Sequence, residues 1–279
     1  MYENILLPVD EGTESSGLLH HAAEIAHWAD AEITLLSVAD TTRDSVTVAD
    51  GEVLDTLVES GENLVDETSR LLDSLGVDYT TDVVQGAPAQ TIVDYAERYE
   101  YDLVAMPTHG REGLSRYLLG SVTEKVVRLS SVPVLTAHAD EEALSFPYEG
   151  ILLPTDGSNS AQRAAEHALS FADELDATLH AVSVTADSLL GEAANATAAE
   201  EAINAVVETA EARGFKNVET HIEAGKPDEV ILSYVESHGL DAVVMGTTGR
   251  RGIDRVLLGS VAEKTVRSAT VPVVTVGGE

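Results

Sequence analysis

The chain has 279 residues, no cysteine and a formal net charge of -33, from 16 Lys plus Arg against 49 Asp plus Glu. This acidity argues against binding nucleic acid or an anionic membrane through a general basic surface, and the lack of cysteine excludes disulfides and thiolate metal sites. The sequence has no run of 18 apolar residues and no basic apolar leader, so we expect a cytoplasmic protein.

The acidic residues are spread evenly along the chain. An even spread favours adaptation to concentrated salt, as in a halophile's cytosolic protein, because screening at high ionic strength removes the self-repulsion. The alternative is a docking surface for a basic partner. Thermal stability that rises steeply with KCl would support the first interpretation.

Apolar runs alternate with helical patterns from the N-terminus onward, which predicts an α/β fold. Gly76 and Gly214 end two of the helices, and Ser158 or Ser160 is the expected N-cap of another. His20, His21 and His27 have no partner at metal-ligand spacing and are expected on the surface.

The predicted strands of the first half are 4–9, 33–38, 77–85, the run ending at 106 and 132–137. The predicted helices of this half are 15–28, 53–75, 88–101 and 121–130.

The same pattern then repeats. Residues 106–122, MPTHGREGLSRYLLGSV, match residues 245–261, MGTTGRRGIDRVLLGSV, at a constant offset of 139. The repeat predicts two tandem domains, 1–137 and 149–279, joined by a linker over 138–148. The second set of strands is 151–156, 178–184, 217–223, 241–245 and 271–276, and its helices are 161–175, 196–213, 227–240 and 260–269.

Each half is therefore predicted to be an open parallel sheet of five strands with helices on both faces, in the strand order 3-2-1-4-5. Pro133 and Pro272 near the start of the last strands fit an edge position. We expect these two edges to pair with each other across a pseudo-twofold axis.

In this strand order, the ends of strands one and four are neighbours at the switch point where such sheets bind ligands. Asp156 would accept a hydrogen bond from a ribose hydroxyl or an adenine amine. Gly246, Gly249 and the Gly259-Ser260 helix start would hold phosphates. Arg250, Arg251 and Arg255 are either phosphate ligands or solvated loop charges.

The spacing G-x2-G-x9-G-S, with Pro-Thr-Asp after strand one, resembles the tandem type of universal stress protein over nearly the whole chain. The resemblance implies an adenine-nucleotide alpha-hydrolase-like fold that binds ATP or AMP, with or without Mg²⁺. It also implies domain pairing through the last strand, and a homodimer of tandem chains is an open possibility. The implied contacts are Pro154, Thr155, Asp156, Val184, Met245, Gly246, Gly249, Arg250, Gly259, Ser260 and Val261.

The first half departs from this pattern, because Pro107 stands where the first glycine belongs, Val9 replaces the Thr and Glu11 follows Asp10. Proline fixes φ and removes an N–H, which would alter a phosphate loop. The corresponding contacts, should this half bind, are Pro8, Val9, Asp10, Val38, Met106, Gly110, Gly120, Ser121 and Val122.

Catalysis has little support in the sequence, which contains no P-loop lysine and no nucleophile elbow. We therefore expect a nucleotide binder with at most slow ATP hydrolysis, acting in a stress response or in signalling. Two alternatives stay open. One is a scaffold that binds no nucleotide, in which the glycines serve only the fold, and the other is a nucleotide hydrolase or adenylating enzyme.

Overall fold

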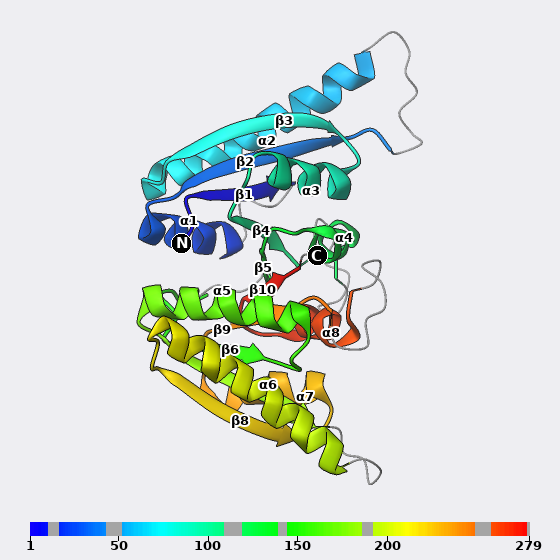
Figure 1. The fold of residues 1–279 in the computed structure, drawn as a ribbon. Helices are drawn as coiled ribbons and strands as arrows, with labels where there is room; N and C mark the ends of the chain where they lie inside the picture. The colour runs from blue at the N-terminus through cyan, green and yellow to red at the C-terminus, as the bar shows by residue number, and fades with distance from the viewer. Residues whose placement is uncertain are drawn as a thin grey trace.

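Strands and helices alternate through both halves of the chain in the computed structural model (Figure 1), which describes residues 1–10, 17–42, 52–108, 119–138, 144–185, 192–248 and 258–277. The first half contains β1 (Asn4–Val9), α1 (Gly17–Ala29), β2 (Glu32–Asp40), α2 (Glu52–Leu75), β3 (Tyr79–Gly86), α3 (Pro88–Arg98), β4 (Leu103–Pro107), α4 (Ser121–Leu129) and β5 (Val134–Ala137). The second contains β6 (Gly150–Pro154), α5 (Asn159–Leu175), β7 (Thr178–Thr185), α6 (Glu192–Arg213), β8 (Val218–Ala224), α7 (Pro227–His238), β9 (Ala242–Gly246), α8 (Ser260–Ser268) and β10 (Val273–Val276).

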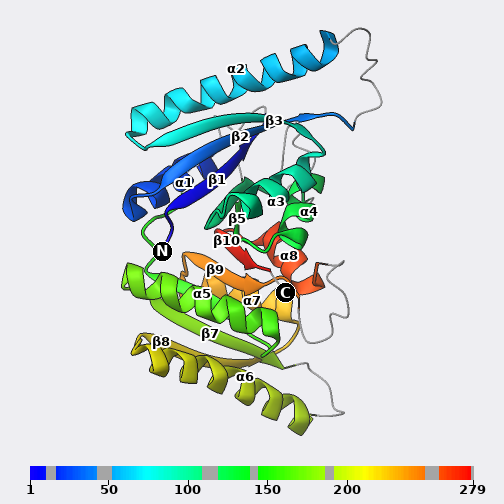
Figure 2. The same ribbon diagram turned by 45° about the horizontal axis from the view of Figure 1, so that its top comes forward.

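All ten strands form one sheet in the order β3-β2-β1-β4-β5-β10-β9-β6-β7-β8. Each half thus has the expected order 3-2-1-4-5 of parallel strands. The halves join where β5 pairs antiparallel with β10, so the sheet as a whole is mixed. Figures 1 and 2 show β5 and β10 in the middle of the molecule and β3 and β8 at its two ends.

Helices cover both faces of this sheet because its strands are apolar on both sides. One core runs through both halves and joins β1, β2, β6 and β7 to the apolar faces of α1, α2, α5 and α6. On the other face each half has its own core, under α3 and α4 in the first and under α7 and α8 in the second. Within the described residues no helix is long and apolar enough to cross a membrane.

The junction between the halves is reciprocal, as a pseudo-twofold axis requires. The Thr136 hydroxyl donates to the Val273 carbonyl oxygen at 3.1 Å, and the Thr275 hydroxyl donates to the Val134 carbonyl oxygen at 3.3 Å. Leu119 packs against the core under α7 and α8, while Leu258 reaches the core under α3 and α4. The expected pairing of the last strands is therefore present.

A second reciprocal contact joins the halves through two Tyr–His pairs. The Tyr2 hydroxyl lies 2.9 Å from His167 Nε2, and the Tyr148 hydroxyl lies 2.6 Å from His21 Nε2. Burial lowers the pKa of each imidazole to about 4, so both rings are neutral, and each shares a hydrogen bond with its phenol. The prediction that His21 is a surface residue is wrong, because the side chain is buried against Tyr148 at the end of the predicted linker.

Two further details differ from the sequence-based expectation. The last strands begin after Pro133 and Pro272, and both strands are internal in the ten-stranded sheet, whose edges are β3 and β8. The prolines still contribute acceptors, since Val104 N donates to Pro133 O and Val243 N to Pro272 O, both at 2.9 Å. The described end of the predicted linker, residues 144–148, is also part of the core, where Tyr148 is buried.

Candidate functional site

The carboxyl ends of β6 and β9 lie side by side in the second half, because these strands pair in parallel. The turn after β6 is held by local hydrogen bonds. Thr155 N donates to Val182 O at 2.9 Å, and Ser158 N donates to Asp156 Oδ1 at 3.0 Å. The Asp156 carboxylate is thus exposed but anchored at the point where α5 begins.

The N-terminus of α5 packs directly against the end of β9. Ser158, one of the two candidates from the sequence, is the N-cap, and its Oγ accepts from Ala161 N at 3.3 Å. The hydroxyls of Ser158 and Ser160 both donate to the carbonyl oxygen of Thr248. These bonds connect the first turn of α5 to the chain that follows β9.

Gly246 is required for this close approach. A Cβ placed on it would lie 2.6 Å from Ser160 Oγ, 2.8 Å from Ser160 C and 2.9 Å from Ser160 O. The absence of a side chain at position 246 is therefore explained by packing of the strand against the helix, whatever ligand the corner holds. Pro107 stands at the matching place in the first half.

We expect Gly246→Ala to destabilise the fold by about 1–3 kcal/mol, the usual cost of overpacking. Urea denaturation of the variant would measure the loss. A Cβ at position 246 would also clash with the backbone C and O atoms of Ser160, not only with its hydroxyl. Adding Ser160→Ala should therefore not restore the lost stability. Full rescue by that second change, or an unchanged midpoint in the single variant, would contradict the packing explanation.

The start of α8 completes the corner. Gly259 is its N-cap and provides no side-chain acceptor. Gly259 N donates to Thr247 O at 2.8 Å, which holds the helix start against the end of β9. Ser260 follows with an exposed side chain. An α-helix leaves its first N–H groups without intrahelical partners and carries partial positive charge there, so this end can bind an anion.

The first half has the same helix start with different neighbours. Gly120 caps α4, and its N–H donates to Thr108 O at 2.8 Å. Thr123 Oγ1 donates to Pro107 O at 2.9 Å, a bond that Ala262 cannot make in the second half. A cavity of about 430 Å³ lies beside Ser121 and Val122, lined also by the end of β2 and the start of α3.

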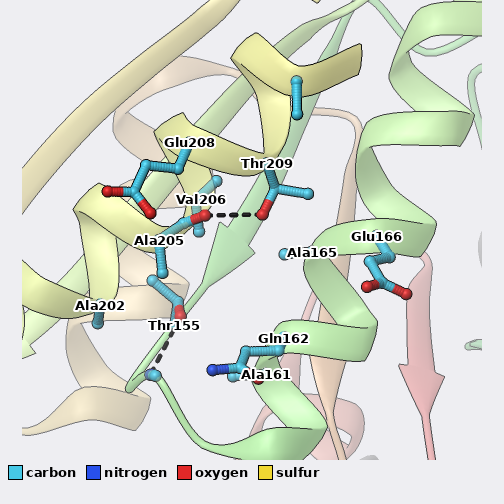
Figure 3. Close-up of a pocket in the computed structure, with 12 residues that line it drawn as sticks. Thr155, Ala161, Gln162, Ala165, Glu166, Ala202, Ala205, Val206, Glu208 and Thr209 are labelled. Carbon is cyan, nitrogen blue, oxygen red and sulfur yellow. Dashed lines mark hydrogen bonds between the residues drawn. The ribbon is translucent and has the colours of Figure 1, made fainter.

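A further cavity of about 410 Å³ separates α5 from α6 (Figure 3). Small side chains form its walls, notably Ala161 and Ala165 on α5 and Ala202 and Ala205 on α6. Thr155 is the one predicted site residue that reaches it. The sequence analysis missed this hollow, and the alanine-rich pattern of the two helices was the available signal.

The structure places most of the predicted site residues at these corners. In the second half it brings together Pro154, Thr155, Asp156, Met245, Gly246, Gly259, Ser260 and Val261, with Val184 on the neighbouring strand β7. In the first half Pro8, Val9, Asp10, Val38, Met106, Gly120, Ser121 and Val122 occupy the matching positions. Gly110, Gly249 and Arg250 lie outside the described residues, as do His109, Arg251 and Arg255.

Comparison with known families decides what this duplicated fold is. The model of the universal stress protein family matches residues 1–138 and again residues 147–277. The chain belongs to the universal stress protein family. Its two family segments are the two halves that the sequence repeat indicated.

Relatives of this universal stress protein match it one half at a time or as a whole. Two universal stress proteins of Methanocaldococcus jannaschii are 37% identical over 138 residues and 31% identical over 152 residues. They cover 48% of this chain each, and the matches span 81% and 94% of the relatives. A crystal structure of a universal stress protein from Archaeoglobus fulgidus superimposes with a TM-score of 0.78 at 26% identity, over 98% of both chains.

Proposed function

We propose that this universal stress protein binds an adenine nucleotide, ATP or AMP, beyond the carboxyl ends of β6 and β9, and acts in a stress response through the bound state. One observation carries the proposal: the start of α8, whose N-cap Gly259 has no side chain to accept a hydrogen bond, lies against the end of β9, beside the anchored Asp156 carboxylate. The helix start suits a phosphate, with or without Mg²⁺, and the carboxylate suits a ribose hydroxyl or an adenine amine.

Calorimetric titration of ATP and AMP into the full chain, with and without Mg²⁺, tests this proposal. We expect saturable binding that the double variant Asp156→Asn/Ser260→Ala weakens at least about tenfold, since a hydrogen bond to a charged group contributes about 1.5–3 kcal/mol. Both side chains are exposed, so these replacements leave the core intact.

The first half provides the matched control. Asp10→Asn/Ser121→Ala makes the same chemical change at the corresponding corner and should leave the affinity of the second-half site unchanged. Equal loss in both double variants would point to a general charge effect. No heat and no shift in Tm at saturating nucleotide would overturn the proposal.

A scaffold without nucleotide is the second candidate, and the packing of the glycines favours it. A Cβ on Gly246 would collide with Ser160, and one on Gly259 would lie 3.0 Å from Thr247 O. The fold alone therefore accounts for both glycines. Denaturing the purified protein and measuring adenine absorbance in the released small molecules distinguishes the two functions.

A further inference from the structure

A group of histidines lies in the second half where β7 and β8 pair, on the face of the sheet that Tyr234 and His238 of α7 cover. Figure 2 shows β7 and β8 side by side. His180 comes from β7, and Glu219 and His221 come from β8. The parallel register sets His180 opposite Glu219, and His221 follows two residues later on the same face of β8. His180 is near the amino end of β7, whereas the nucleotide site proposed above lies beyond the carboxyl ends of the strands.

The two imidazoles and the carboxylate converge on one point. His180 Nδ1 lies 3.6 Å from Glu219 Oε2, and His221 Nε2 lies 3.8 Å from the same oxygen. One ligand atom from each of the three residues lies within 4.8 Å of the other two. In tetrahedral zinc sites the metal bonds of about 2.0–2.1 Å place neighbouring ligand atoms roughly 3.4 Å apart.

Hydrogen bonding within the protein does not account for this arrangement. Both distances to Glu219 are too long for hydrogen bonds, and His221 Nε2 is shielded from solvent without any hydrogen-bond partner. His180 Nδ1 has only a long contact of 3.4 Å to the Tyr234 hydroxyl. A buried polar nitrogen without a partner requires an explanation, and a bound cation supplies one.

The surroundings suit a metal ion that prefers imidazole ligands. Metal ions of this kind bind the neutral imidazole of histidine. His238 stacks on Tyr234 with ring centroids 3.8 Å apart, and its own centroid lies 6.2 Å from that of His180 and 6.1 Å from that of His221. The Glu219 side chain is 59% exposed, which leaves a path for the metal and for a water as fourth ligand.

The equivalent position in the first half has no histidine. Thr34, Thr80 and Asp82 stand where His180, Glu219 and His221 stand in the second half. Thr34 Oγ1 lies 2.9 Å from Thr80 Oγ1, and Asp82 Oδ2 accepts from the Tyr95 hydroxyl at 2.8 Å. The polar side chains of this equivalent site therefore have hydrogen-bond partners within the protein, and its ligand set is not one that zinc prefers.

We propose that His180, Glu219 and His221 bind a divalent metal ion of the zinc class, with water as the fourth ligand. Such an ion would tie β7 to β8 under α7. Two neutral imidazoles and one carboxylate are a known zinc ligand set, and without sulfur the order of affinity among divalent ions also admits Co²⁺ and Ni²⁺.

Zinc titration of the full chain, stripped with a chelator and kept in excess Mg²⁺ to occupy ordinary carboxylate sites, tests the proposal. We expect one tight Zn²⁺ per chain and a rise in Tm on binding. Co²⁺ in place of Zn²⁺ should give the intense visible absorption of a tetrahedral site. His180→Ala and His221→Ala should each weaken zinc binding about 100-fold or more, because losing even an outer-shell partner costs 10–100-fold.

Of the three ligand variants, Glu219→Gln should disturb folding least, because the Glu219 side chain is exposed. It should lower the zinc affinity and change the Co²⁺ spectrum. His20→Ala removes an exposed histidine from α1 and is the matched control that should bind as the wild type does. Undiminished zinc binding in Glu219→Gln and in the two histidine variants, or an octahedral Co²⁺ spectrum in the wild type, would overturn the proposal.

Discussion

Acidification from pH 7 to pH 4 should lower the free energy of unfolding by about 3 kcal/mol for each of His21 and His167. The folded-state pKa of each imidazole is about 4, below the ordinary value of 6.5, because burial opposes the charged form. The unfolded chain therefore binds more protons than the folded one between these values. The stabilisation is complete above pH 6.5 and is lost as the pH falls toward 4. Urea denaturation at a series of pH values measures it.

The double variant His21→Gln/His167→Gln isolates this contribution, since carboxylate titration and the fall in the net charge of -33 affect both proteins alike. Its midpoint should depend less steeply on pH between 6.5 and 4 than that of the wild type. His20→Gln/His27→Gln, at two exposed positions of α1, controls for the loss of two imidazoles. A slope that stays the same without His21 and His167 would contradict the assignment.

The strands and helices were predictable because the duplicated pattern shows each element twice. The alternation of apolar runs with helical patterns also restricts the strand order, and the repeated glycines indicate the corner where the helices begin. In each half, most of the predicted contact residues lie at one end of the sheet because parallel strands bring their carboxyl ends together.

Contacts between distant segments were not predictable from patterns of this kind. His21 lies on a helix whose sequence gives no sign of Tyr148, its partner 127 residues later. His180 and His221 meet only through the register of β7 with β8, which residue spacing does not reveal. The alternation of Glu219 and His221 along one strand face was the available signal. Gly246 shows a different limit of sequence motifs. A glycine that matches a ligand-binding motif can also be required for packing, and the motif alone does not distinguish the two reasons.

Phe171→Ala should destabilise the protein by about 3–5 kcal/mol, the range typical of a large buried aromatic side chain. The Phe171 ring is 1% exposed and lies on α5 among aromatic rings from the first half and the linker. Its centroid is 5.5 Å from that of Tyr2, 5.6 Å from that of Tyr148 and 6.1 Å from that of Trp28. Truncation removes the shared packing of these rings, and urea denaturation measures the cost.

Phe215→Ala is the matched control, because Phe215 is also buried in the second half but has no aromatic contact with the first among the ring pairs of the described residues. Both variants should lose stability. Only Phe171→Ala should also speed proteolytic cleavage within the 138–148 linker, since Tyr148 loses the ring that it packs against. Equal cleavage rates in the two variants would show that the aromatic cluster stabilises the second half without holding the linker and the two halves together.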